Sequence, residues 1–322
     1  MAYVSAPTTD SHPLDTLWQL VQAYGGDMAV PDHGALVDHL RYSSFAHFIE
    51  TWWWMTGFLR RYEDFELVAE SVAADLARQN IIYAEASFSP TDFARHGLDP
   101  QGIALAIRSG LDRVDGTRVA LNCDLVRDTG PGHAARTLAA VLEIADAADI
   151  RGITIGGSEQ SYPPELFKDV YRSASENGFR LTAHAGEAAG PESVRGALDT
   201  LGVERIGHGV RIIEDPQLLE RVVADQIPLE VCPTSNIRTG VVSGWDDHPI
   251  GQLLESGANV TVSSDDPTFF HTSVAAELRE VADRYRVNPL LLTNRAIAAS
   301  WMTPTEKEEA FASVDSWWAA EA

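Results

Sequence analysis

The sequence is poor in cysteine and has no long apolar stretch. Only two of its 322 residues are cysteines, Cys123 and Cys232, and they lie far apart in otherwise apolar runs. Buried, reduced thiols are therefore expected rather than a disulfide or a thiolate metal site, which suits a cytoplasmic protein. No apolar run approaches the length needed to span a bilayer, and the N-terminal MAYVSAPTTD lacks the basic flank and apolar core of a signal peptide. The sequence thus predicts a soluble, cytoplasmic protein.

Basic residues are scarce compared with acidic ones. The chain has 24 Lys and Arg against 47 Asp and Glu, which gives a formal charge of −23 and a pI near 4.7. No cluster of Lys or Arg occurs, so nucleic acid and anionic membrane surfaces are not expected as partners. A small neutral or cationic molecule fits this charge better, and the composition leaves room for a homo-oligomer.

Short apolar or β-branched runs alternate with longer amphipathic stretches from Ile81 onward. This alternation predicts strands, each followed by a helix whose apolar residues recur at three- and four-residue spacing. The predicted strands are residues 81–88, 119–125, 152–156, 180–184, 205–208, 228–232 and 259–263. The predicted helices between them are residues 100–114, 133–148, 164–178, 188–201, 216–225 and 248–257.

Such an alternation implies a parallel sheet covered by helices, either an open doubly wound sheet or a closed eightfold barrel. Seven strands are one short of closure, and residues 2–5 (AYVS) are the only candidate for a first strand. No repeat or flexible linker interrupts the chain, so residues 1–322 are expected to form a single domain. We therefore predict an α/β fold, a (β/α)8 barrel of the TIM type with a weak first strand. Extra helices follow that strand at 14–24, 35–40, 45–61 and 63–79, and a helical C-terminal tail occupies 273–286, 289–300 and 305–319.

Polar residues that suit catalysis fall at the predicted strand ends, where the catalytic groups of barrels converge. His184 and His208 end two strands, and Asp265 with Asp266 follows the last. In HAGE (184–187) the small residues let the backbone turn sharply and present Glu187 beside His184. The pair could supply a metal ligand and a proton-transfer group.

Each of these motifs, taken alone, has a purely structural alternative. His184 can be a strand-end histidine with its hydrogen bonds satisfied, and Glu187 a first-turn glutamate favoured by the dipole of the next helix. The glycines on either side of His208 suggest close approach by a ligand or by another backbone. Asp266 can be an ordinary helix N-cap before a proline, although adjacent carboxylates repel one another unless a cation or a proton donor separates their environments. The combination at three strand ends of one barrel favours a functional site.

Several motifs in this order resemble the signature of the adenosine deaminase family. They are HAGE at 184–187, IGHGV at 206–210, VCPTSN at 231–236 and SSDDP at 263–267. IGGSE at 155–159 resembles the LGGDE-type turn of that family, and YAEASFSP at 83–90 resembles its YxExRxSP stretch. The likeness runs from about Leu14 to the C-terminus.

The resemblance implies hydrolytic deamination of a 6-aminopurine nucleoside or a related compound, with ammonia released. One divalent metal, normally zinc, would activate a water for attack on the purine C6. By the resemblance, His184 and Asp265 would be metal ligands and Glu187 would protonate the ring N1. His208 would hold the activated water in place as a base or as an electrostatic partner.

The resemblance also implies contacts to the substrate. Asp266 would bond the N7 side of the purine, the backbone N–H of Gly157 would reach N3, and Asp10 would stand near the acid that binds the ribose or its equivalent. The stretch FIETWWWM at 48–55 lies where the family has an apolar gate helix. Its three consecutive tryptophans cannot share one helix face, and Trp52 is our candidate for the one facing the cleft. The alternative is that they wedge between the inserted helices and the barrel. Phe269 and Phe270 after the acid pair either line the substrate pocket or pack the last helix.

One family motif does not occur in the sequence. The family opens with a strand that ends His-x-His-Leu-Asp/Glu-Gly, whose two histidines complete the metal site. Aligning residues 16–20 with the next helix of the family places Ser5 and Pro7 at the histidine positions, and neither can replace an imidazole. His12 comes several residues too late and precedes a proline, so we do not expect it to be a ligand. Two protein ligands would leave zinc short of the usual three.

Three interpretations of this departure stay open. In the first, the real gene product begins upstream or with a different N-terminus. In the second, the chain is a family member that has lost metal-dependent hydrolysis and binds a purine ligand. The third is metal-independent chemistry by Glu187 and His208 on another substrate. Ser87 stands where adenosine deaminases usually carry Arg, and branches acting on adenine or 6-aminodeoxyfutalosine are less strict there, so the exact substrate is not decided. Zinc deaminases of the cytidine type are excluded, because their H-x-E and P-C-x-x-C ligands do not occur.

Overall fold

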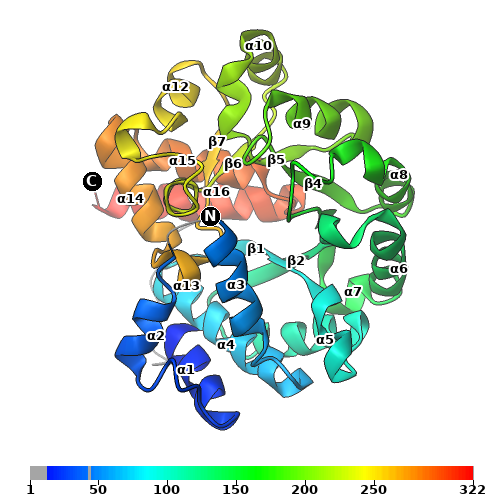
Figure 1. Ribbon diagram of the computed structural model, residues 1–322. Coiled ribbons are helices and arrows are strands. Elements are labelled where there is room, and N and C mark those ends of the chain that lie inside the picture. The colour runs from blue at the N-terminus through cyan, green and yellow to red at the C-terminus, as the bar shows by residue number, and fades with distance from the viewer. Residues whose placement is uncertain (1–12, 43–44, 322) are drawn as a thin grey trace.

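Seven parallel strands form one curled sheet whose spatial order follows the sequence, from β1 to β7. The computed structural model of the chain describes residues 13–42 and 45–321. In Figure 1 the strands lie at the centre and helices surround them. The strands are β1 (Tyr83–Phe88), β2 (Arg118–Asp124), β3 (Ile150–Thr154), β4 (Arg180–Ala185), β5 (Arg205–His208), β6 (Leu229–Val231) and β7 (Val260–Val262).

The observed strands confirm the seven predicted from the sequence. All six neighbouring pairs are parallel. Strand residues are largely buried, with every residue of β5 and β7 inside, as expected for a parallel sheet covered by helices. The first strand predicted at 2–5 lies outside the described residues, as do Ser5, Pro7, Asp10 and His12.

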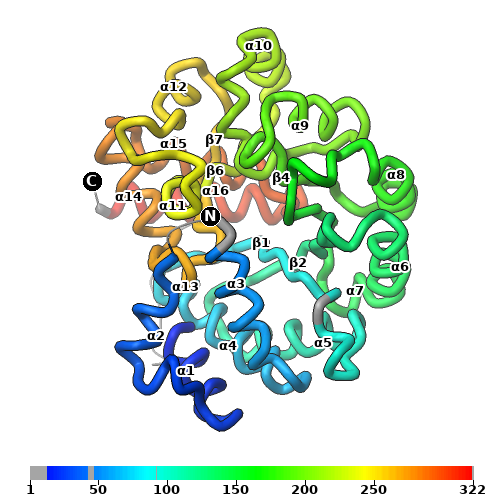
Figure 2. Tube along the Cα trace, in the orientation of Figure 1, coloured from blue at the N-terminus to red at the C-terminus, as the bar shows by residue number. Residues whose placement is uncertain are grey.

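Helices connect successive strands and cover the outside of the sheet. Figure 2 shows α5, α6, α8, α9 and α10 following one another around the strands. These connecting helices are α5 (Pro100–Leu111), α6 (Pro131–Leu142), α7 (Ala145–Ala148), α8 (Lys168–Glu176), α9 (Pro191–Gly196), α10 (Pro216–Ala224), α11 (Pro233–Arg238) and α12 (Ile250–Glu255). Short 3-10 turns are η1 (Pro90–His96), η2 (Arg127–Thr129), η3 (Pro164–Phe167), η5 (Val210–Glu214) and η6 (Trp245–Asp247), and η4 (Ala197–Leu201) is a π-helical turn.

Further helices precede β1 and follow β7, as predicted. The first group is α1 (Pro13–Ala23), α2 (His33–His39), α3 (Phe45–Thr56) and α4 (Tyr62–Arg78). The second is α13 (Pro267–Phe270), α14 (Val274–Tyr285), α15 (Pro289–Ala299) and α16 (Pro304–Glu321). None of the helices in the described part of the chain is both long enough and apolar enough to cross a membrane.

Some predicted helix boundaries are wrong, and local chemistry explains where. The helix predicted at 45–61 stops at Thr56, because Gly57 follows it and glycine commonly ends helices. The helix predicted at 188–201 starts only at Pro191, since proline suits the first helical position. The stretch predicted at 133–148 is divided between α6 and α7, with Ile144 in a non-helical conformation between them.

A buried charge cluster joins three strands within the sheet. The guanidinium of Arg205 in β5 lies 2.6 Å from Glu85 Oε2 in β1 and 3.1 Å from Glu230 Oε1 in β6. It also lies 3.6 Å from the ring centre of Trp301. The side chain of Arg205 is only 5% exposed, and its charge offsets that of the largely buried Glu85 and of the partly exposed Glu230. Elsewhere in the interior the two cysteines are buried and free, as predicted.

Candidate active site at the carboxyl ends of the strands

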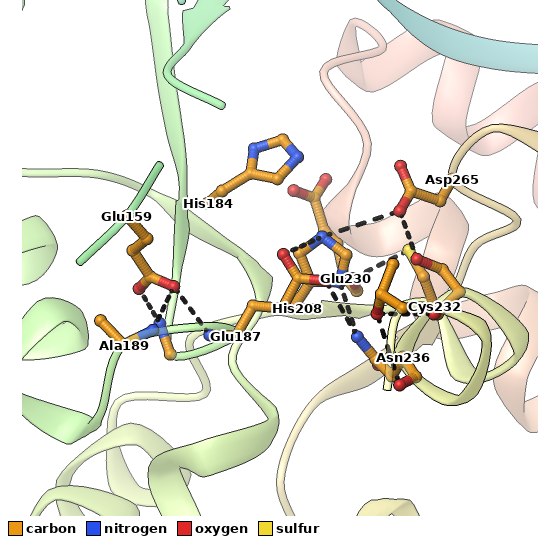
Figure 3. Close-up of polar contacts among 12 residues, drawn as sticks. Glu159, His184, Glu187, Ala189, His208, Glu230, Cys232, Asn236 and Asp265 are labelled. Carbon is orange, nitrogen blue, oxygen red and sulfur yellow. Dashed lines mark hydrogen bonds and ion pairs between the residues drawn. The ribbon is translucent and has the colours of Figure 1, made fainter. Parts of the chain in front are cut away.

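Two imidazoles and a carboxylate converge where the strands end. His184 lies in β4, His208 is the last residue of β5, and Asp265 follows β7. One candidate ligand atom from each lies within 4.8 Å of the others. Figure 3 shows the three side chains around a common space. The convergence predicted from the sequence is therefore present, although the residues are up to 81 positions apart (265 minus 184).

The backbone is left-handed at two of these residues. His208 has φ of +62° and Asp265 has φ of +55°, in a region that non-glycine residues rarely occupy. Gly209 next to His208 is also left-handed, and a Cβ there would lie 2.9 Å from Leu229 Cδ2. The close approach of another backbone that the sequence predicts is present at Gly207, where a Cβ would lie 3.3 Å from the Cα of His184; at Gly209 the neighbour is a side chain. Left-handed residues of this kind cluster at functional sites, where the surrounding structure holds them in place.

A short loop after β4 carries Glu187 toward the imidazoles. Gly186 makes the turn with φ of +69°, and a Cβ there would lie 2.6 Å from Val194 Cγ2. Glu159, itself 3% exposed, accepts hydrogen bonds from the N–H groups of Gly186 (2.6 Å), Glu187 (3.2 Å) and Ala189 (2.8 Å). Because α9 begins four residues after Glu187, this glutamate is not a first-turn residue, and the dipole alternative is wrong.

The carboxyl group of Glu187 is held among polar partners in a largely buried position. Its Oε2 lies 3.5 Å from His208 Nε2, and its Oε1 accepts a hydrogen bond of 3.4 Å from Asn236 Nδ2. Burial, with the negative charge of Asp265 next, raises the pKa of Glu187 to about 8. The group therefore carries a proton at neutral pH.

The side chains of His184 and Asp265 each have a second contact that orients them. His184 Nδ1 lies 3.3 Å from Thr154 Oγ1, which turns its Nε2 toward the common space. Asp265 Oδ2 accepts a hydrogen bond of 2.7 Å from Ser235 Oγ. Supporting contacts of this kind fix the direction of ligand atoms in metal sites.

Asp266 has a buried carboxyl group, and Gly157 has a backbone conformation that favours glycine. Asp266 stands at the N-cap position of α13, but its side chain makes no capping hydrogen bond. Burial, followed by the charge of Asp265, raises the pKa of Asp266 well above its ordinary value. Gly157 has φ of +106°, and a Cβ there would lie 2.0 Å from Asp128 Oδ2, so only glycine fits.

The three tryptophans of α3 point in different directions. Trp52 stacks on Phe269, with ring centres 5.4 Å apart and an interplanar angle of 25°. Trp53 is 46% exposed, and Trp54 donates a hydrogen bond of 2.9 Å to Asp27 in the N-terminal helical region. Phe269 and Phe270 are buried, and both rings pack against Phe48 of α3. Trp52 is thus joined through Phe269 to the segment that carries the acid pair.

Sequence reasoning assigned no role to two residues that organise the site. Glu159 holds the loop of Glu187, and Asn236, which has no exposed surface, contacts both Glu187 and His208. Both lie in motifs that the sequence displayed, IGGSE and VCPTSN. Their side-chain partners lie 27 to 49 residues away, so the local pattern did not reveal them.

Comparisons with known proteins identify the family of the chain and its fold. The family model for adenosine deaminase matches residues 12–317. An aminodeoxyfutalosine deaminase from Streptomyces avermitilis is 35% identical over 307 residues, which cover 91% of this chain and 84% of that protein. An adenine deaminase from Streptomyces coelicolor is 36% identical over 250 residues, covering 76% of this chain and 73% of that protein.

The fold is also that of a solved relative. The crystal structure of an adenine deaminase from Arthrobacter aurescens is 28% identical and superposes with a TM-score of 0.87, covering 97% of this chain and 98% of that one. The likeness confirms the predicted α/β barrel of the TIM type. The chain therefore belongs to the adenosine deaminase family, hydrolases that act on a carbon–nitrogen bond of a cyclic amidine.

Proposed function

We propose that this protein removes the exocyclic amino group of a 6-aminopurine compound by hydrolysis. The observation that carries the proposal is the convergence of a protonated acid, Glu187, with His184, His208 and Asp265 at one end of the strands. The relatives above are deaminases of adenine and of aminodeoxyfutalosine, which supports an aminopurine-like substrate. In the reaction a water oxygen bonds to the ring carbon, the carbon–nitrogen bond breaks, and the amino group leaves as ammonia.

Glu187 is the proton donor in this proposal. An aromatic amine is a poor leaving group until the ring is protonated and its carbon becomes tetrahedral. A carboxyl group that keeps its proton at neutral pH can transfer it to ring N1. The carboxylate so formed can then take the two protons of the attacking water in turn, passing one to the departing amine and keeping the other, which regenerates the acid. The loop held by Glu159 keeps Glu187 at the reacting centre.

His184 and Asp265 are the proposed metal ligands. An imidazole nitrogen and a carboxylate oxygen are donors that zinc takes, and the contacts to Thr154 and Ser235 orient both. The residues fit part of a zinc site, one ligand fewer than the usual three. A divalent ion bound there would supply Lewis-acid activation of water.

The remaining predicted residues are proposed substrate contacts. Asp266 would meet the N7 side of the purine, the N–H of Gly157 would meet N3, and Trp52 would close the cleft beside Phe269. Asp10 stays a prediction from the sequence alone. Ser87 is exposed in β1, and its small side chain fits a substrate range wider than adenosine.

The test is ammonia release from a panel of adenine, adenosine and a 6-aminodeoxyfutalosine-type nucleoside, with the metal content of the same preparation measured by elemental analysis. We expect near-stoichiometric zinc and ammonia from at least one compound, with both lost in His184→Ala and Asp265→Ala. A protein that binds purine but takes up no zinc after supplementation, and releases no ammonia, would instead be a purine-binding member without hydrolysis. Ammonia release that survives chelation would refute the metal assignment but not the deamination itself.

A further inference from the structure

A line of buried hydrogen bonds starts at Nδ1 of His208, the ring nitrogen that does not face Glu187. His208 Nδ1 lies 3.2 Å from Asn236 Nδ2, and Asn236 Oδ1 lies 3.4 Å from His248 Nε2. The other ring nitrogen of His248, Nδ1, lies 3.1 Å from the backbone nitrogen of Ile250. The exposed fractions are 2% for His208, 0% for Asn236 and 4% for His248, so water does not compete for these groups.

The backbone of Ile250 gives this line its direction. Ile250 is the first residue of α12, and a first-turn N–H has no acceptor within its own helix. A backbone N–H can only donate, so His248 Nδ1 accepts. Burial lowers the pKa of His248 to about 4, which keeps the ring neutral, and its single hydrogen therefore lies on Nε2.

The hydrogen on His248 Nε2 also determines which atoms of Asn236 accept and donate. His248 Nε2–H donates to Asn236 Oδ1, which leaves the amide Nδ2 of Asn236 to donate to His208 Nδ1. Neutral His208 then carries its hydrogen on Nε2. That atom lies 3.5 Å from Glu187 Oε2 and 3.9 Å from Asp265 Oδ2, and a carboxyl oxygen has a lone pair that can accept whether or not the group carries a proton.

The reverse orientation of the amide conflicts with these contacts. If Asn236 Oδ1 faced His208, Asn236 Nδ2 would donate to His248 Nε2, and the hydrogen of neutral His248 would move to Nδ1. Two donors, His248 Nδ1–H and the Ile250 N–H, would then face each other across 3.1 Å.

We propose that His248 is a positioning residue that sets the tautomer of His208 through Asn236. The inference rests on the proposed function and deepens it. Of the two roles open to His208, base or electrostatic partner, the hydrogen-bond direction assigns the second. His208 presents an N–H to the reacting atoms, so it holds the attacking oxygen and stabilises its developing charge without taking its proton.

The tautomer can be measured without any turnover. Protein labelled with ¹⁵N in its histidine rings gives distinct nitrogen shifts for Nδ1–H and Nε2–H tautomers, and His208→Asn identifies the His208 signal by its loss. At a pH at which His208 is neutral, we expect the Nε2–H form in the wild type. Asn236→Asp offers only acceptors and should move the hydrogen to Nδ1. A wild-type protein with His208 in the Nδ1–H form overturns the proposal, whatever its activity.

Variants of His248 test the remote link. His248→Gln keeps a donor toward Asn236 and should retain the Nε2–H tautomer, whereas His248→Phe removes that donor and should give a mixture of tautomers. His248→Phe should also lower kcat roughly 10- to 100-fold with KM little changed, and His248→Gln should recover much of that loss. His133→Phe on α6 is the matched control and should change neither readout. A folded His248→Phe protein with the wild-type His208 spectrum contradicts the link, and if it does not fold, the Gln and Asp variants still decide.

Discussion

Replacing Glu187 with Gln isolates the proton that the proposed chemistry needs. With a pKa of about 8, the carboxyl is protonated in roughly nine of ten molecules at pH 7. Gln has the same size and keeps an amide oxygen that can accept from Asn236, but it has no acidic proton to give. General acid–base catalysis contributes about 10²- to 10⁴-fold, equivalent to roughly 3–5 kcal/mol of barrier. We therefore expect kcat to fall by at least about 10²-fold.

The pH dependence adds a second readout on the same group. Because the active form is the protonated one, wild-type kcat should be level below the pKa and fall about tenfold per pH unit above about 8. Ammonia release measured between about pH 6 and about pH 10 follows this fall in kcat, and the Gln variant should not show the fall.

A control variant in the helix that follows this loop distinguishes loss of the proton from loss of the fold. Glu192→Gln removes an exposed carboxyl in the first turn of α9 and should leave kcat within about twofold of the wild type. Circular dichroism and the thermal midpoint check that each variant is folded. A folded Glu187→Gln protein with kcat within tenfold of the wild type would refute the assigned role.

Three further predictions concern stability and are measured by urea unfolding. Arg205→Ala removes the cation shared by the largely buried Glu85 and the partly exposed Glu230 and should cost about 3–5 kcal/mol, whereas a loss under 1 kcal/mol would show that the cluster contributes little. Gly110→Ala places a Cβ 2.1 Å from the carbonyl oxygen of Glu66 where α5 crosses α4, and should destabilise the protein by about 1–3 kcal/mol or more; a neutral result would contradict this packing. The buried ring of His248 has a pKa of about 4, below its unfolded value of 6.5, so above pH 6.5 its ionisation does not affect the free energy of unfolding. As the pH falls from 6.5 to about 4, protonation of this histidine in the unfolded chain should lower the free energy of unfolding by about 3 kcal/mol, and His248→Phe should lack that pH-dependent loss.

The sheet and its strand-end residues could be predicted from the sequence because both are local patterns. A buried strand is a short apolar run, and His184 and His208 stand where such runs end. Parallel strands then bring those ends to one edge whatever their separation in sequence. Glu187 follows from the same reasoning, since small residues beside His184 imply a sharp turn.

What the sequence did not reveal depends on contacts between distant segments or on elements too short to show a period. The six-residue α11 and the four-residue α13 span less than two helical turns, so apolar spacing cannot identify them. Asn236 and His248 are an ordinary amide and an ordinary histidine until folding places them in line with His208. The direction of that line depends on one backbone N–H, a group that every residue except proline possesses.

If this site hydrolyses a 6-aminopurine, the new oxygen of the product comes from water. The reaction is run in water enriched in ¹⁸O with the substrate that releases ammonia, and the purine product is analysed by mass spectrometry. We expect one heavy oxygen per product molecule for each ammonia released. A product that lacks heavy oxygen, or the absence of product from every 6-aminopurine tested with zinc-supplied protein, would contradict it.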